Sequence, residues 1–239
     1  GIDLIGKLNV LRGVEYPNDP AMAARVASYE LAFRMQKSVP DVVDFSQETA
    51  EKQALYGIDQ PHSRDFGMTL LASRLFIERG VRCIQVQHGA GGAGVWDAHG
   101  GLKANHSRNA LAVDKPVAGL LEDLDRRGLL DETLVLWAGE FGRTVYSQGT
   151  LTSENYGRDH HPRCFSLWLA GGGIKPGITY GRTDEYSYNI VDRPVEVHDL
   201  HATMLHLLGL NHERLIYRLQ GRDFRLTDVA GHLIKDIVL

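Results

Sequence analysis

The sequence contains few cysteines, and their spacing excludes the common cysteine motifs. Among 239 residues only Cys83 and Cys164 are present, without the CxxC spacing of zinc fingers or redox motifs. Each lies in or beside an apolar run, which predicts two reduced thiols in the interior, where free cysteine is usually found. A disulfide between them stays open at this level.

Long apolar runs and a strong charge bias are also missing. No apolar run is long enough to cross a bilayer, so we expect no membrane span. The formal net charge of -4, without a basic block, gives no drive toward nucleic acid, and we expect no such partner. The chain also lacks the glycine fingerprint of dinucleotide-binding proteins and the GxSxG elbow of serine hydrolases.

Helical and strand patterns alternate along the chain, which predicts an α/β fold. Apolar positions between capping residues and glycine or proline stops predict helices over about 19–38, 48–55, 65–79, 105–127 and 199–208. Short apolar runs predict strands over about 81–87, 133–138 and 165–170, with a hairpin near 177–181. Such alternation favours a doubly wound, mostly parallel sheet covered on both faces. We expect one domain, 1–239, with a helical lead-in (1–64) and an α/β core (65–239).

Metal-type ligands follow the first predicted strand. Asp97 and His99 are separated by one residue, so in a turn they can converge on one ion. A glycine-rich loop at 89–94 and Trp96 precede them and suit a shaped pocket. Taken alone, the segment is equally well read as a polar surface loop. His88 and His106 are candidates for residues that hydrogen-bond to the ligand-bearing segment without binding the ion themselves.

A carboxylate and an arginine follow the second predicted strand. Glu140 lies one residue beyond this apolar run, and Arg143 lies three residues further on. A carboxylate at a strand end is commonly a metal ligand or general base, and an arginine beside it can hold an anion. A purely structural ion pair between the two is the alternative.

Three consecutive ligand-capable residues, Asp159, His160 and His161, lie shortly before the third predicted strand. Burying such a group without a partner would be costly, so its position favours metal binding. The histidines of the last predicted helix, His198, His201 and His206, do not share one face and are expected to be ordinary surface residues.

These segments together resemble the family known as DUF1501 and, more distantly, the alkaline phosphatase superfamily with its sulfatases. The matching stretches are Glu78–Arg82, Trp96–Gly100, Gly139–Thr144, Gly157–Pro162, Leu169–Gly173, Thr183–Glu185 and His198–Gly209. The resemblance implies a two-metal hydrolase of phosphate or sulfate esters with an alkaline-phosphatase-like fold and an extracytoplasmic location. Its substrate would be a small-molecule or glycan ester.

The resemblance also implies roles for individual residues. Asp97, His99 and His160 match the ligands of one divalent ion, with Asp159 and His161 beside them as further candidates. Glu140 matches a ligand of the second ion, and Arg143 or Arg158 would hold the substrate anion. Zinc is the expected metal, with manganese and calcium as alternatives.

Two departures from the superfamily pattern matter. Phe141 stands where many relatives have a histidine of the second metal, and no apolar strand here ends in the Asp and Ser/Thr that supply the nucleophile. The chain begins at Gly1 without an initiator methionine, so we expect a fragment that lacks the N-terminal part of the fold. Little or no esterase turnover is then expected. The alternative is a catalytically inactive module that binds anionic glycans or other anionic ligands.

Overall fold

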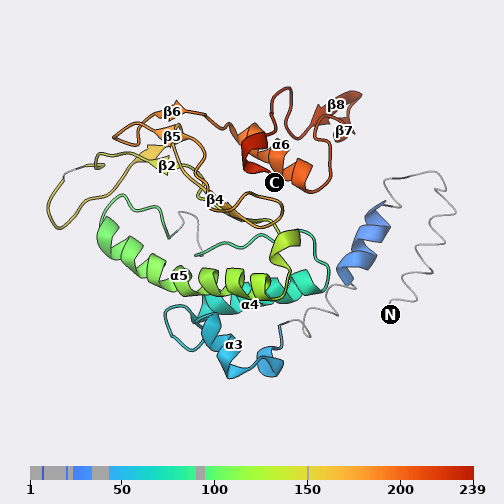
Figure 1. The fold of residues 1–239 in the computed structure, drawn as a ribbon, viewed down its shortest axis with the longest axis horizontal. Coiled ribbons are helices and arrows are strands. Elements are labelled where there is room, and N and C mark those ends of the chain that lie inside the picture. The colour runs from blue at the N-terminus through green and yellow to red at the C-terminus, as the bar shows by residue number, and fades with distance from the viewer. Residues whose placement is uncertain (1–6, 8–19, 21–23, 34–42, 90–94, 150) are drawn as a thin grey trace.

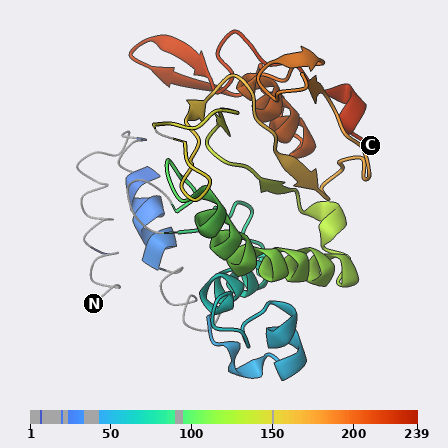
Figure 2. The ribbon, with the colours of Figure 1, turned by 90° about the vertical axis from the view of Figure 1, so that its left-hand side faces the viewer.

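The computed structural model describes residues 7, 20, 24–33, 43–89, 95–149 and 151–239. Three of the helices, α3, α4 and α5, lie together, and the short strands lie with α6 (Figures 1 and 2). The long helix α5 crosses the middle, with α3 and α4 on one side and the strands and α6 on the other. No helix among the described residues is both long and apolar enough to span a bilayer.

The helices begin and end near the predicted positions. The structure contains α3 (Ala50–Leu55), α4 (Arg64–Glu78), α5 (Leu102–Arg126) and α6 (Val197–Leu207), with 3₁₀ turns η1 (Phe45–Gln47), η2 (Leu130–Glu132) and η3 (Lys235–Ile237). Residues 24–33 are also helical, and the rest of the helix predicted over 19–38 falls mostly outside the described residues. The predicted glycine stops are confirmed at Gly80, Gly128 and Gly209, where φ is +81°, +68° and +76°.

Residue roles at two helix starts differ from the prediction. The N-cap of α4 is Ser63. Asp65 lies in the first turn, where its negative charge stabilises the helix by interacting with the helix dipole. Glu196 caps α6, and Asp199 is the third helical residue of a reciprocal capping box. The Asp199 carboxylate accepts the Glu196 N–H at 3.0 Å and the His232 N–H at 2.7 Å. Asp199 therefore ties the C-terminal segment to the start of α6.

The prediction of a doubly wound, mostly parallel sheet is wrong. Within the described residues all the strands pair in antiparallel ribbons of two. They are β1 (Val135–Trp137) with β4 (Trp168–Ala170), β2 (Gly142–Arg143) with β3 (His160–His161), β5 (Arg182–Thr183) with β6 (Ile190–Asp192), and β7 (Ile216–Leu219) with β8 (Arg222–Arg225). The hairpin predicted near 177–181 is instead formed by β5 and β6.

The connection between the predicted strands explains their direction. Parallel neighbours need a long crossover, usually a helix, whereas antiparallel strands do not. The chain between β1 and β4 forms the β2–β3 ribbon but no helix in its described part, and β4 returns antiparallel to β1. The predicted strand at 81–87 forms no ladder, and most of its side chains are exposed, unlike those of a buried parallel strand.

Exposure also corrects the prediction that both cysteines are buried. Cys164 is buried, whereas Cys83, in the unpaired segment 81–87, is exposed. Both thiols are free.

Two apolar clusters lie on opposite sides of the β1–β4 ribbon. The larger one joins α4 and α5 to the preceding segment through Tyr56, Ile58, Phe66, Leu70, Leu71, Val113, Leu120 and Leu124. Val135 and Trp137 of β1 pack against it, whereas Leu134 and Leu169 pack against the smaller cluster of Ile174, Ile234 and Ile237. Because successive strand residues face opposite sides, one ribbon contacts both clusters.

A buried ion-pair network joins α4 to α5. Arg74 and Asp123 are 2% and 0% exposed, and Arg74 Nε lies 3.1 Å from Asp123 Oδ2. Arg74 also pairs with Glu48 at 2.5 Å and Glu78 at 2.8 Å, while Asp123 accepts hydrogen bonds from Lys52, Tyr56 and Arg127. Burial would raise the pKa of Asp123, but the bonds from Lys52, Arg127 and Tyr56 hold it below its usual value. The carboxylate therefore stays ionised in the interior.

We expect Asp123→Asn to lower the free energy of unfolding by roughly 3 kcal/mol, because it removes the buried carboxylate that pairs with Arg74, Lys52 and Arg127. Glu48 and Glu78 remain as counter-charges for Arg74. Glu122→Gln, the next residue of α5, is the matched control. Its exposed i,i+4 pair with Arg126 contributes less than about 1 kcal/mol. Urea denaturation measures both, and equal effects of the two substitutions would contradict the importance of the network.

Candidate metal centre

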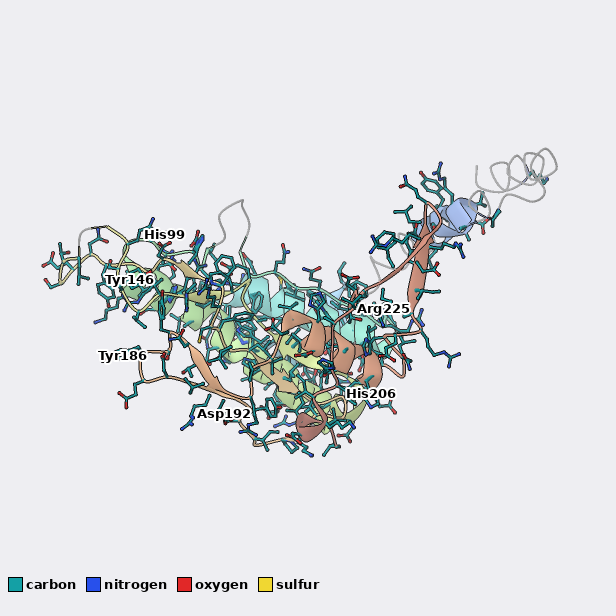
Figure 3. All side chains as sticks on the ribbon, turned by 90° about the horizontal axis from the view of Figure 1, so that it is seen from above. His99, Tyr146, Tyr186, Asp192, His206 and Arg225 are labelled. Atoms are coloured by element: carbon teal, nitrogen blue, oxygen red, sulfur yellow. The ribbon has the colours of Figure 1, made fainter. Side chains whose placement is uncertain are left out.

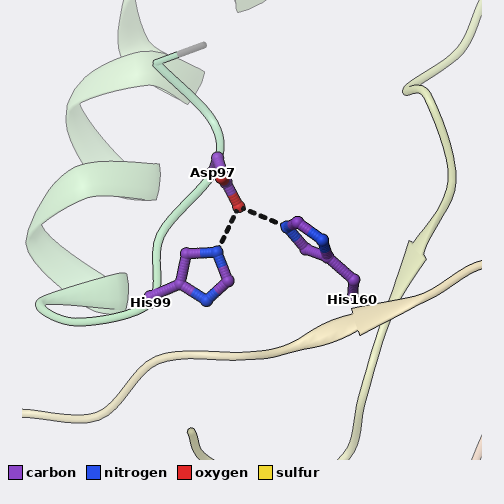
Figure 4. A group of neighbouring side chains, drawn as sticks. All are labelled: Asp97, His99 and His160. Carbon is purple, nitrogen blue, oxygen red and sulfur yellow. Dashed lines mark hydrogen bonds and ion pairs between the residues drawn. The ribbon is translucent and has the colours of Figure 1, made fainter. Parts of the chain in front are cut away.

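Asp97, His99 and His160 converge at one end of the molecule, the end opposite Arg225 and the β7–β8 hairpin (Figures 3 and 4). Asp97 Oδ1 lies 2.9 Å from His99 Nε2 and 3.1 Å from His160 Nε2. One possible ligand atom from each residue lies within 4.8 Å of the other two. The side chains are partly accessible, so a small ion or substrate can reach them.

Main-chain hydrogen bonds hold the segment that carries Asp97 and His99. The Arg158 N–H donates to the Ala98 carbonyl and the Leu102 N–H to the Tyr156 carbonyl, both at 3.0 Å. The Asn155 side chain accepts the Gly101 N–H at 2.8 Å, at the start of α5. Residues 155–158 and 98–102 are therefore fastened together directly before the helix.

Gly157 permits this contact. A Cβ at residue 157 would overlap the carbonyl group of His99 and lie 2.6 Å from the Gly100 nitrogen. Only glycine lets the two chain segments lie this close without moving the backbone that carries His99. The sequence analysis did not identify Gly157 or Asn155 as residues that form the site. Gly157 could have been noticed as the first residue of the stretch that contains Asp159 and His160, whereas nothing in the sequence pointed to Asn155.

The β2–β3 ribbon positions His160. Arg143 is paired with His160, and Gly142 with His161. The buried Thr144 links the strands further, since its N–H donates to the Asp159 carbonyl at 2.9 Å and its hydroxyl accepts the Asp159 N–H at 3.0 Å. The ribbon is short, but these bonds fix the position of His160 opposite the Asp97 segment.

Arg143 connects Glu140 to the cluster. Its Nη1 donates to Asp97 Oδ1 at 2.8 Å, and its Nη2 donates to Glu140. The guanidinium group also lies 5.5 Å from the centre of the Phe141 ring, and this ring packs edge to face with the His160 ring at 4.9 Å between centres. Glu140 therefore contacts the centre through Arg143. The two residues form the ion pair that the sequence analysis gave as the alternative to a metal ligand.

The surroundings of Asp97 favour its charged form. Partial burial would raise the pKa of Asp97, but the hydrogen bond from His160 and the positive charge of Arg143 together hold it below its usual value. The carboxylate thus remains anionic, as a metal ligand must be.

The remaining predicted site residues point elsewhere. The Asp159 carboxylate accepts the backbone N–H of His160 at 2.7 Å. His161, which follows His160 on the strand, is buried, stacks on Tyr188 and has its Nε2 2.6 Å from the Tyr188 carbonyl. Arg158 Nη1 donates to the Gly157 carbonyl, and its guanidinium lies 5.8 Å from the Tyr156 ring. The structure joins none of these three side chains to the Asp97 cluster by a hydrogen bond or ion pair.

The donor set fits a divalent ion. One carboxylate and two imidazoles are ligands that zinc accepts, and bonds of roughly 2.0–2.1 Å in a tetrahedral centre place neighbouring ligand atoms about 3.4 Å apart. The two separations from Asp97 Oδ1, 2.9 and 3.1 Å, are close to this spacing, and all three ligand atoms lie within 4.8 Å of one another. The other ring nitrogen of His99, Nδ1, faces away from Asp97 and His160 (Figure 4) and is buried without a hydrogen-bond partner.

The profile of a family described as "Protein of unknown function (DUF1501)" matches residues 1–238. The chain therefore belongs to this family. Comparisons with curated proteins and with solved structures gave no match.

We expect Gly157→Ala to destabilise the protein by roughly 1–3 kcal/mol, because the added methyl group separates the Asp97 segment from residues 155–158. Gly139→Ala is the control, since a Cβ there would lie 3.7 Å from its nearest neighbour. Guanidinium unfolding of both variants measures the difference. A Gly157→Ala protein as stable as Gly139→Ala would show that the close packing is not required.

Proposed function

We propose that Asp97, His99 and His160 bind one divalent metal ion, zinc before manganese or calcium, in a hydrolase of phosphate or sulfate esters. The observation that carries this proposal is the convergence of three ligand-type atoms within 4.8 Å. The similarity of the chain's motifs to the alkaline phosphatase superfamily supports the ester chemistry.

The number of ligands favours catalysis over a structural role. Structural zinc sites are usually closed by four protein ligands, whereas catalytic sites use three and leave a position for water or substrate. The described residues supply three here, with His160 the most exposed at 44%. A substrate could therefore approach from the side of His160.

Arg143 is the residue best placed to bind the ester anion. A guanidinium group has five N–H donors, and the described contacts of Arg143 use Nη1 for Asp97 and Nη2 for Glu140. Glu140 would hold the planar group in position while the free N–H groups contact the oxygens of a phosphate or sulfate. When bound, the ion supplies Lewis-acid stabilisation of the charge that develops on the ester oxygens.

One ion per chain fits the described residues better than two. Glu140, the candidate ligand of a second ion, is paired with Arg143, and the Phe141 ring packs against His160. Within the described part of the chain, Asp97, His99 and His160 form the one group of three ligand-type residues that converges. We therefore assign Glu140 to positioning Arg143.

We expect the purified protein to retain about one zinc ion per chain after dialysis. Asp97→Ala and His160→Ala should lose it, because each removes a ligand. Glu140→Gln and His161→Phe are the controls and should keep it, the second because phenylalanine preserves the stack on Tyr188. Elemental analysis decides the point. Two ions in the wild type and one in Glu140→Gln would overturn the single-ion assignment, and zinc retained by His160→Ala would overturn the ligand set.

We expect slow, zinc-dependent hydrolysis of nitrophenyl phosphate or sulfate that is absent from His160→Ala. It should be slow because no serine or threonine hydroxyl of the described chain hydrogen-bonds to Asp97, His99 or His160. Thr144 donates to the Tyr146 carbonyl and Ser147 to the Gln148 carbonyl. If nitrophenol is released at the same rate with and without zinc, the protein is not a zinc-dependent hydrolase. If the same protein still binds inorganic phosphate, it is an anion-binding module instead.

A further inference from the structure

Two histidines outside the cluster hold the residue that precedes Asp97. The indole Nε1 of Trp96 donates a hydrogen bond to His88 Nδ1 at 2.9 Å. On the other side, His106 Nε2 lies 3.2 Å from the Trp96 carbonyl oxygen. Trp96 is therefore contacted through its side chain by one histidine and through its main chain by the other.

The partners require a different proton position on each ring. An indole N–H can only donate, so His88 Nδ1 must accept and carry no proton. A carbonyl oxygen can only accept, so His106 Nε2 must carry one. Burial lowers the pKa of His88, which agrees with a neutral ring that can accept at Nδ1.

Packing against both long helices completes the arrangement. The rings of Phe66 in α4 and His88 pack nearly perpendicular to each other, with their centres 5.0 Å apart. The ring centre of Trp96 lies 5.7 Å from that of His88 and 5.4 Å from that of His106. The buried Asn109 of α5 donates to the Val95 carbonyl at 2.7 Å. The peptide units on both sides of Trp96 are thus attached to α5, directly before the carboxylate of Asp97.

We infer that His88 and His106 are positioning residues that hold Trp96 through different ring nitrogens and thereby hold Asp97 and His99 in place to bind the ion. The inference rests on the proposed metal site. Groups that orient metal ligands from outside typically contribute about 10–100-fold to metal affinity. Here the orientation acts on the backbone of the ligand-bearing segment rather than on a ligand side chain.

The test replaces each histidine in turn with asparagine and with glutamine. The amide group of asparagine lies near the place of Nδ1, and that of glutamine near the place of Nε2. His88→Asn and His106→Gln should therefore keep the hydrogen bond and bind zinc within about 3-fold of the wild type. His88→Gln and His106→Asn should bind about 10–100-fold more weakly. Competition with a chromophoric chelator measures zinc affinity, and the visible spectrum of bound cobalt reports ligand geometry.

A second readout does not depend on metal. The indole N–H resonance of Trp96, assigned with Trp96→Phe, should stay protected from solvent exchange in metal-free wild type and His88→Asn. It should lose protection in His88→Gln.

The possible outcomes separate the two proposals. Equal zinc affinity in all four variants would overturn the inference, and so would an equal loss in all four, which would indicate general packing. A wild type that binds no zinc would refute the metal site. The indole resonances would then still decide whether His88 holds Trp96 through Nδ1.

Discussion

The rest of the structure depends on the buried contact between Arg74 of α4 and Asp123 of α5. Two charges removed from water are tolerated only when several partners satisfy them, and here Glu48, Glu78, Lys52, Tyr56 and Arg127 do so. Burial raises the pKa of the Tyr56 hydroxyl and the Asp123 carboxylate raises it further, so the hydroxyl remains a donor. A requirement this specific fixes how α4 and α5 face each other, which apolar contacts alone would leave less defined.

The helix fixed in this way also supports the candidate centre. Asp123 lies near the end of α5, whereas Asn109, which holds the Val95 carbonyl, lies near its beginning. Their separation of 14 positions, 123 minus 109, corresponds to about 21 Å of helix. One rigid element therefore places the Asp97 segment, while His160 comes from a two-stranded ribbon on the other side of the cluster.

The sequence predicted local features well and non-local ones poorly. Helix ends followed from nearby residues such as Gly80 and Gly128, whose conformations the structure confirms. Strand direction depends on which distant segment pairs, and nothing within 133–138 or 165–170 specifies an antiparallel partner. The same distinction applies at the centre. The spacing of Asp97 and His99 identified them as a candidate pair, and the family resemblance put His160 ahead of His161. The physical reason that only His160 faces Asp97 lies in the strand, whose alternation sends neighbouring side chains to opposite sides. Gly157 was missed because its role depends on the His99 backbone, 58 residues earlier in the chain.

The pairing of the strands in twos has a consequence for local stability. Each ribbon has few backbone hydrogen bonds, and β2 and β3 have two residues each. The helices α4 and α5 instead share the larger apolar cluster and the buried ion pairs. Opening free energies in such a molecule differ between regions, from near zero at ribbon ends to the global value in a packed core. The amides of β2 and β3 will therefore exchange with solvent through small local openings, whereas those in the middle of α5 exchange only on global unfolding. The closed ribbon fixes His160, and a local opening of the ribbon releases His160 from Asp97 while α4 and α5 stay folded.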